Sequence, residues 1–110
     1  GACLMIKKER FLEVNGFDED LPVAYNDVDF CLRLLRKGYF NVTLSHVCLY
    51  HMESRSRGED DDDEKRKRFL KEKETMLRRW ETLIKRDPFY NPNLTLDSED
   101  FFIKLEKIDS

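Results

Sequence analysis

The chain of 110 residues lacks the features that mark several common classes of protein. Its three cysteines, Cys3, Cys31 and Cys48, are widely spaced and include no Cys-x-x-Cys pair, so neither a disulfide framework nor a structural zinc site is expected. The longest apolar run, Ala2 to Ile6, is far shorter than the roughly 20 residues that span a bilayer, and no basic and apolar leader precedes it. We therefore expect reduced thiols in an intracellular protein.

Charge is abundant but has no dominant sign. The 20 basic and 23 acidic residues are intermixed and give a net charge of -3, so no broad basic face is expected and nucleic acid is a poor partner. Charged residues make up 39% of the chain and hydrophobic residues 40%, which leaves apolar material for one small core.

The N-terminal residues predict a buried strand followed by a short helix. The strand covers Ala2 to Ile6, and the helix covers Lys7 to Val14 and ends at Asn15-Gly16, where both residue types tolerate a left-handed backbone. The apolar run begins directly after Gly1 without an initiator Met, so we expect the chain to be a piece of a longer protein.

A second helix is predicted from Asn26 to Gly38. Asn26 occupies the expected N-cap position and Gly38 the stop, with apolar residues at helical spacing between them: Val28, Cys31, Leu32 and Leu35. Phe40 to Leu44 and Val47 to Tyr50 are rich in β-branched and aromatic residues, which predicts either a pair of strands or one bent strand. His51 then follows the end of a strand.

The second half of the chain predicts one long amphipathic helix from about Lys65 to Lys85. The apolar stripe on its charged background consists of Phe69, Leu70, Met76, Leu77, Trp80, Leu83 and Ile84. The loop before it carries an acidic run, Glu59 to Glu64, which we interpret as solvated charge. Asp87-Pro88 ends the helix, Pro88 to Leu96 is turn-rich, and Ser98 to Ile108 fits a strand or a short helix.

Two carboxylates begin the helix at Asn26. Asp27 and Asp29 are carried by the first turn of a helix, which would hold a general base in place. The structural interpretation stays open, because acidic residues at a helix N-terminus offset the helix dipole. Asp29 can also cap Asn26 reciprocally or pair with Arg33 at i+4.

A second polar group follows the predicted strand at Tyr50. His51 can ligate a divalent ion, and the guanidinium groups of Arg55 and Arg57 can bind a diphosphate with help from the hydroxyls of Ser54 and Ser56. One histidine does not make a metal site, so a purely structural His51 also stays open.

These segments, taken together, resemble the C-terminal half of family 2 glycosyltransferases, the inverting enzymes with the GT-A fold. Gly16-Phe17-Asp18-Glu19 is similar to the family turn Gly-Gly-Phe-Asp-Glu, with Asn15 in place of the first Gly. Asn26 to Arg33 resembles the family helix Glu/Asn-Asp-x-Asp-Leu-x-x-Arg, and Gly38-Tyr39 matches a family Gly-Tyr. His51 to Gly58 resembles His-x-Glu-Ser-x-Ser-Arg-Gly. Asp87 to Leu94 is similar to an Asp-Pro-Tyr-Tyr-Asn-Pro-Asn-Leu found in polysaccharide-building members.

The resemblance covers residues 1–96 and leaves residues 97–110 as a tail. It implies an α/β fold class, specifically a partial GT-A fold in which a few strands pack with two or three helices. It assigns the catalytic base to Asp27 and a metal ligand to His51. Site-supporting or acceptor roles fall to Asp18, Glu19, Asp29 and Arg33, and diphosphate binding falls to Ser54, Ser56 and Arg57.

The resemblance also implies a reaction and its partners. A hydroxyl of a glycan or a lipid-linked acceptor would attack a nucleotide-sugar with inversion, in polysaccharide synthesis in the cytoplasm or at the inner face of the membrane. The intact enzyme would use Mg²⁺ or Mn²⁺, while the chain alone would be inactive and need hold no metal. The nucleotide-binding half with its Asp-x-Asp is missing, and self-association through exposed apolar surface is expected. The alternative is a non-catalytic interaction module built on the charged amphipathic helix.

Overall fold

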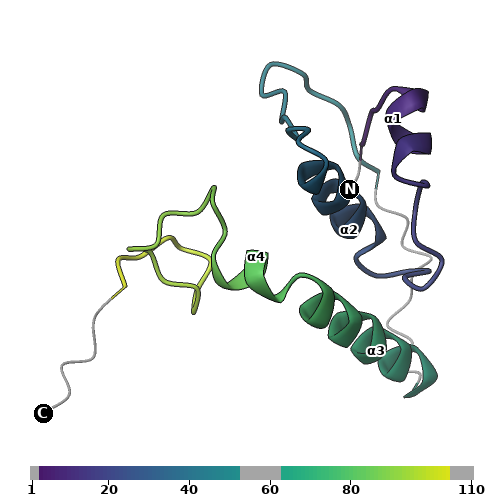
Figure 1. Ribbon diagram of the computed structural model, residues 1–110. Helices are drawn as coiled ribbons and strands as arrows, with labels where there is room; N and C mark the ends of the chain where they lie inside the picture. Colours follow the sequence, from purple (N-terminus) through teal and green to yellow (C-terminus); the bar gives the residue numbers. More distant parts are fainter. Residues whose placement is uncertain (1–2, 53–62, 105–110) are drawn as a thin grey trace, which may run out of the picture. The chain divides into compact units, whose positions relative to one another are not determined.

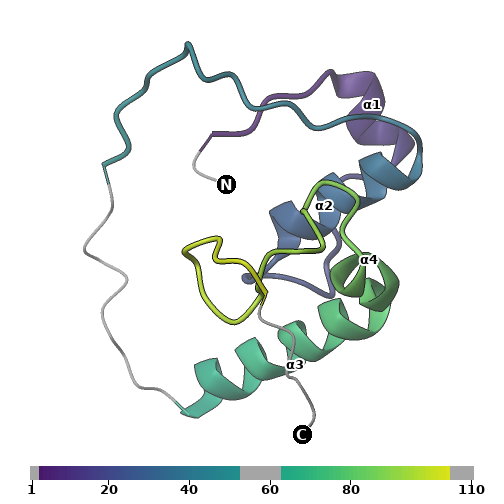
Figure 2. The same cartoon turned by 90° about the vertical axis from the view of Figure 1, so that its left-hand side faces the viewer.

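The computed structural model describes residues 3–52 and 63–104. The chain divides into two compact units, Gly1–Met76 and Leu77–Ser110. Figures 1 and 2 show the course of the chain from two directions. Among the described residues, helices account for 42% and strand for 2%, and no sheet forms. None of the helices in these ranges has the length and apolar character that a membrane span requires.

Two of the helices predicted for the first unit are confirmed. α1 spans Lys8–Glu13 and α2 spans Asn26–Arg36 (Figure 1). α2 ends before Gly38, which has a φ of 91° that suits glycine. The predicted N-cap is wrong by one residue, because Tyr25 is the cap. Tyr25 has a φ of 63°, and its side chain makes no capping hydrogen bond.

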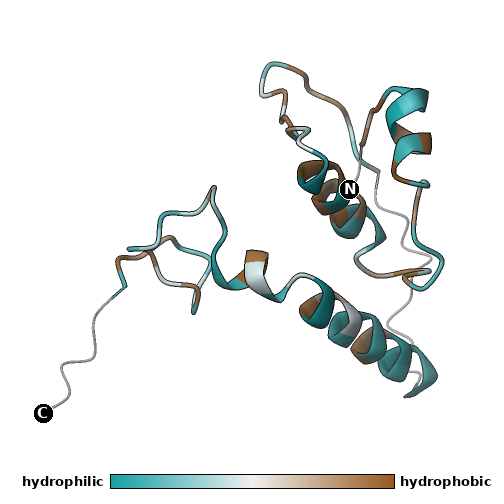
Figure 3. Ribbon diagram, in the orientation of Figure 1, coloured by the Kyte–Doolittle hydropathy of each residue, from teal (hydrophilic) through white to brown (hydrophobic). Residues whose placement is uncertain are grey.

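The core of the first unit lies between α1 and α2. Val14, Phe30 and Leu34 are buried at its centre, and Ile6, Phe11, Cys31 and Tyr39 pack partly buried against them. The rings of Phe11, Phe17 and Phe30 form a cluster with centroid separations between 5.0 and 5.6 Å. Figure 3 shows hydrophobic residues on both helices.

The buried face of α2 differs from the predicted one. Phe30 and Leu34 are the buried apolar residues of this helix, whereas Val28 from the predicted stripe is 46% exposed. Helical spacing is compatible with two overlapping apolar faces on α2, one that contains Val28 and one that contains Phe30. The face with Phe30 is the buried one, and the Phe30 ring contacts the ring of Phe11.

The predicted α/β fold class, with a partial GT-A fold of strands packed on helices, is wrong for the described residues. Residues 3–6, 40–44 and 47–50 form neither strands nor a sheet, and residues 39–52 run as an irregular trace in Figure 2. Large apolar side chains of this segment are exposed: Phe40, Val42, Leu44, Leu49 and Tyr50. A strand needs a neighbour to complete its backbone hydrogen bonds, whereas a helix completes its own, so the sequence pattern alone does not produce a strand.

The predicted long helix is present but interrupted. α3 spans Asp63–Arg79 and α4 spans Glu81–Lys85, with Trp80 between them at φ -115° and ψ 19°. Met76 and Trp80 of the predicted stripe are buried, whereas Phe69, Leu70, Leu77 and Ile84 are 44 to 55% exposed. The apolar spacing therefore located the helical segment but did not reveal its break.

The second unit continues from the end of α3 through α4 into a turn-rich segment. The predicted turns between Pro88 and Leu96 are confirmed, because the backbone N–H groups of Phe89 and Asn93 donate to the side chains of Asp87 and Asn91, at 2.8 and 3.0 Å. An isolated antiparallel bridge joins Leu94 and Ile103. Residues 98–103 therefore form neither of the regular elements expected for them, and the predicted division at residue 96 stays a prediction.

Candidate functional site

The turn after α1 brings the chain back against its own helix. Asn15 and Gly16 both have positive φ values, 60° and 63°. A Cβ at position 16 would lie 2.7 Å from the Phe11 ring, so the close approach requires glycine there. Asparagine tolerates a left-handed backbone better than most residue types other than glycine. Asn15 can therefore stand where the similar turn of family 2 glycosyltransferases has its first Gly.

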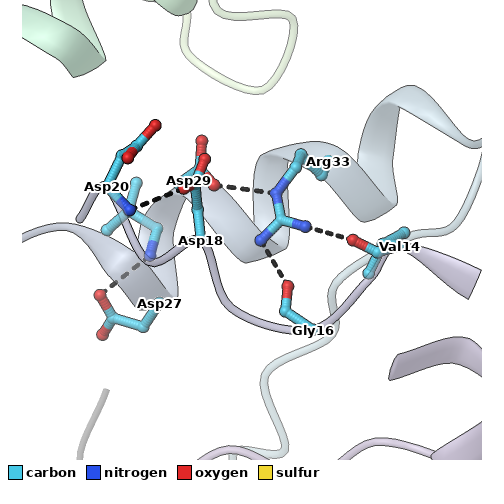
Figure 4. Close-up of polar contacts among 8 residues, drawn as sticks. Val14, Gly16, Asp18, Asp20, Asp27, Asp29 and Arg33 are labelled. Atoms are coloured by element: carbon cyan, nitrogen blue, oxygen red, sulfur yellow. Dashed lines mark hydrogen bonds and ion pairs between the residues drawn. The ribbon is translucent and has the colours of Figure 1, made fainter. Parts of the chain in front are cut away.

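Arg33 ties this turn to α2. Its Nε donates to a carboxylate oxygen of Asp29 at 2.8 Å, and its terminal nitrogens donate to the backbone carbonyls of Val14 and Gly16, the latter at 2.6 Å (Figure 4). Asp29 is fully buried. The i+4 pairing of Asp29 with Arg33, one of the interpretations open from the sequence, is therefore confirmed. Arg33, Asp29 and the carbonyls of Val14 and Gly16 together form the Arg33 clasp.

The acidic residues of the turn adopt different environments. Asp18 is partly buried, and its Oδ1 accepts a hydrogen bond from the backbone N–H of Asp20 at 2.9 Å, which closes the turn (Figure 4). Its backbone carbonyl accepts from the N–H of Leu21, a fully buried residue, at 3.1 Å. Glu19 is exposed. The acceptor or supporting roles predicted for Asp18 and Glu19 stay predictions.

Asp27 lies in the first turn of α2, as predicted. The residue is partly exposed, and its Oδ1 accepts a hydrogen bond from the N–H of Val28 at 2.9 Å (Figure 4). This hydrogen bond fixes the position of one carboxylate oxygen of Asp27, and the helix dipole favours negative charge at this end of α2. Of the two predicted acidic residues, Asp29 is enclosed in the clasp, whereas Asp27 retains access to solvent.

The sequence interpretation missed Glu72, which lies on α3 and contacts the loop before α2. Its side chain belongs to a residue only 3% exposed, and its two carboxylate oxygens accept hydrogen bonds from the backbone N–H groups of Val23, at 3.0 Å, and Ala24, at 3.2 Å. The rings of Phe69 and Tyr25 lie 5.7 Å apart beside these bonds. A signal was present, because Glu72 falls on the apolar face between Phe69 and Met76, three and four residues away.

α1 is connected to the end of α2 by an exposed polar group. Arg10 donates to the Tyr39 hydroxyl at 2.7 Å and to Glu13 at 3.0 Å, and the Tyr39 hydroxyl donates to Glu13. The hydrogen bond from Arg10, followed by that from Tyr39, holds the pKa of Glu13 below its ordinary value. The bond to Glu13 raises the pKa of Tyr39. Tyr39, which follows Gly38, therefore connects the end of α2 to α1 through Arg10 and Glu13.

The predicted metal and diphosphate residues are only partly described. His51 is exposed and follows the irregular segment, so its predicted place after a strand is wrong. Ser54, Ser56 and Arg57 lie outside the described residues. Among residues 3–52 and 63–104, no three His, Cys, Asp or Glu side chains gather as a metal site. A pocket of about 200 Å³ is lined by Glu13, Val14, Asn15, Arg33, Arg36 and Lys37, and thus by neither Asp27 nor His51.

The chain is similar in sequence to short segments of much longer proteins. An uncharacterized protein y4gI of Sinorhizobium fredii (strain NBRC 101917 / NGR234) is 50% identical over 103 residues, which are 93% of this chain and 11% of that protein. The O-antigen biosynthesis protein RfbC of Myxococcus xanthus is 36% identical over 104 residues, which are 90% of this chain and 8% of that protein. This chain therefore spans about a tenth of the length of these two relatives.

A third relative is named for a sugar transfer. It is the N-acetylglucosaminyl-diphospho-decaprenol L-rhamnosyltransferase of Mycobacterium tuberculosis, 33% identical over 60 residues, which are 54% of this chain and 20% of that protein. The chain is similar to part of a glycosyltransferase. No family model matches the chain, and no solved structure is significantly similar to it.

Proposed function

We propose that this chain is the acceptor-side part of a longer glycosyltransferase that uses a nucleotide-sugar donor and inverts the anomeric carbon. Support comes from the partial similarity to a rhamnosyltransferase and to an O-antigen biosynthesis protein. The proposal for the site rests on the place of Asp27, a partly exposed acidic residue in the first turn of α2 with one carboxylate oxygen hydrogen-bonded to the Val28 N–H. The product would be a cell-surface polysaccharide or another glycan, built in the cytoplasm or at the inner membrane face.

In the proposed reaction, Asp27 accepts the proton of the acceptor hydroxyl. The hydroxyl oxygen bonds to the anomeric carbon as the bond to the nucleoside diphosphate breaks, and the diphosphate leaves with the electron pair. Asp27 suits this role because a base must be positioned and must reach the acceptor from solvent, and it meets both needs. Asp29 meets the first need only, because it is buried in the Arg33 clasp.

A divalent cation is part of the proposal through His51. The donor set fits one ligand from the described residues, since the His51 imidazole is exposed while no cluster of three ligands forms around it. The remaining ligands would come from the diphosphate and from other parts of the longer protein. When bound, Mg²⁺ or Mn²⁺ would offset charge on the leaving diphosphate. Ser54, Ser56 and Arg57 are proposed to contact the same diphosphate.

The test uses the full-length protein with a panel of nucleotide-sugars and acceptors, and measures the nucleoside diphosphate released. Asn at position 27 keeps an oxygen that can accept from the Val28 N–H, so Asp27→Asn preserves the local fold. We expect its kcat to fall about 10²- to 10⁴-fold, the usual contribution of a positioned base. The control, Asp97→Asn, changes an exposed carboxylate of the second unit and should retain wild-type turnover. Wild-type turnover of Asp27→Asn would refute the assignment.

The metal role has its own test. His51 is exposed, so His51→Ala should fold normally, and we expect it to raise the Mn²⁺ concentration needed for half-maximal turnover. An unchanged Mn²⁺ dependence would remove His51 from the proposed metal site. His46→Ala is the matched control, because His46 is also exposed and lies in the same irregular segment.

A further inference from the structure

The strongest unassigned feature is the buried carboxylate of Glu72. An ionised carboxylate loses its hydration when it is buried, so it is stable there only when its oxygens accept hydrogen bonds. Both oxygens of Glu72 do so, from the consecutive N–H groups of Val23 and Ala24 at 3.0 and 3.2 Å. Val23 and Ala24 are 49 and 48 positions away from Glu72 in the chain, so the bonds fix a long-range contact rather than a local turn.

The contacted residues lie immediately before α2. Val23 and Ala24 precede Tyr25, the residue with a left-handed backbone that begins the helix, and Asp27 lies two residues further on. Tyr25 also contacts α3, because its ring lies 5.7 Å from the Phe69 ring, measured between centroids. The Tyr25 side chain makes no capping hydrogen bond, and Glu72 and Phe69 of α3 both contact the segment before α2.

We infer that Glu72 is a positioning residue for Asp27: its carboxylate fixes the backbone at Val23 and Ala24 and thereby sets the orientation of the first turn of α2. This inference rests on the proposed function, because Asp27 has an orientation to keep only if it acts as the base. Glu72 itself touches neither a reacting atom nor a substrate. It acts through the backbone, as groups that support a catalytic side chain commonly do.

The direct test of the contact measures hydrogen exchange by mass spectrometry in the full-length protein. In Glu72→Gln, the amide can accept from one of the two N–H groups but turns an NH₂ toward the other, so the pair of bonds cannot be kept. We expect faster exchange in peptides that cover residues 21–28. The matched control is Glu74→Gln, the same change two residues along α3 at an exposed position, which should leave exchange unchanged.

The functional test is a double-mutant comparison of kcat. We expect Glu72→Gln to lower kcat roughly 10- to 100-fold, since a misplacement of about 1 Å at a reacting group can cost about 10²-fold. The donor KM should stay nearly constant, because the change affects the base rather than donor binding. In the Asp27→Asn background, where no base remains to be oriented, Glu72→Gln should lower kcat no further.

The outcomes separate the inference from the proposed function. Unchanged exchange in Glu72→Gln, an unchanged kcat, or an equal loss of kcat in both backgrounds would overturn the positioning role while leaving Asp27 as the base. Wild-type turnover of Asp27→Asn would instead overturn the proposed function, and the positioning role with it, even if exchange shows that the contact exists. If Glu72→Gln does not accumulate as folded protein, Glu72→Asp, which keeps the charge but shortens the reach, is measured in the same way with the same expected directions.

Discussion

Removal of the guanidinium of Arg33 should strongly destabilise the first unit. The guanidinium contacts the carboxylate of Asp29 and the carbonyls of Val14 and Gly16. In Arg33→Met, the apolar stem is kept, but Asp29, a residue with 0% exposure, loses the Arg33 guanidinium. Breaking a buried pair in this way typically costs about 3 to 5 kcal/mol. The Arg33 side chain is 20% exposed, so we expect a value near the lower end, about 3 kcal/mol.

The assay is urea unfolding followed by circular dichroism at 222 nm. Arg33→Lys keeps one positive charge near Asp29 but cannot reach both carbonyls, so we expect a smaller loss of about 1 to 2 kcal/mol. The double variant Asp29→Asn with Arg33→Met should lose less than the sum of the single losses, because the two groups interact. Surface substitutions in proteins usually change the free energy of unfolding by no more than about 0.5 kcal/mol. A loss below about 1 kcal/mol for Arg33→Met would therefore show that the clasp contributes little to stability.

Three further predictions concern the same unit. Gly16→Ala should lower the free energy of unfolding by about 1 to 2 kcal/mol because of the left-handed backbone, and by roughly 1 to 3 kcal/mol more because the new Cβ meets the Phe11 ring. Gly38→Ala should show the backbone contribution alone, because no atom lies within 4 Å of its Cβ position. Equal losses of stability for the two variants in thermal unfolding would contradict this prediction. Burial raises the pKa of the Cys31 thiol, so iodoacetamide should alkylate Cys31 more slowly than the exposed Cys48 at about pH 8, as read by peptide mass spectrometry. The pKa of Glu13 is lowered by hydrogen bonds from Arg10 and Tyr39, so its stabilising effect is present above its ordinary value of 4.5 and is lost as pH falls through the lowered value. The stability difference between wild type and Arg10→Gln should therefore vanish in acid, and a constant difference in acid titrations would argue against the interaction.

Local features of the first unit could be predicted from the sequence. The short helix before Asn15, the helix that begins at Asn26, and the left-handed turn residues are all set by interactions within a few positions. The pairing of Asp29 with Arg33 belongs to the same class, since one helical turn separates the two residues. Spacing in the sequence contains the information for each of these.

Features that depend on distant partners could not be predicted. The strands expected at Phe40 to Leu44 and Val47 to Tyr50 need a neighbouring strand, which the pattern within each segment cannot supply. The contact of Glu72 with Val23 spans 49 residues, and the bond from Arg33 to the Val14 carbonyl spans 19. An acidic residue on an apolar stripe signals that a partner exists, but the sequence does not say which one.

Asp27 and His51 are proposed to act on one bound nucleotide-sugar. A crystal structure of the full-length protein with Mn²⁺ and the nucleoside diphosphate that the turnover assay identifies would test this proposal. We expect an imidazole nitrogen of His51 in the coordination shell of the metal, and the Asp27 carboxylate open to the same cleft on the side where an acceptor would enter. A structure with His51 away from the metal, or with Asp27 facing a different surface of the molecule, would refute the proposed roles of these two residues.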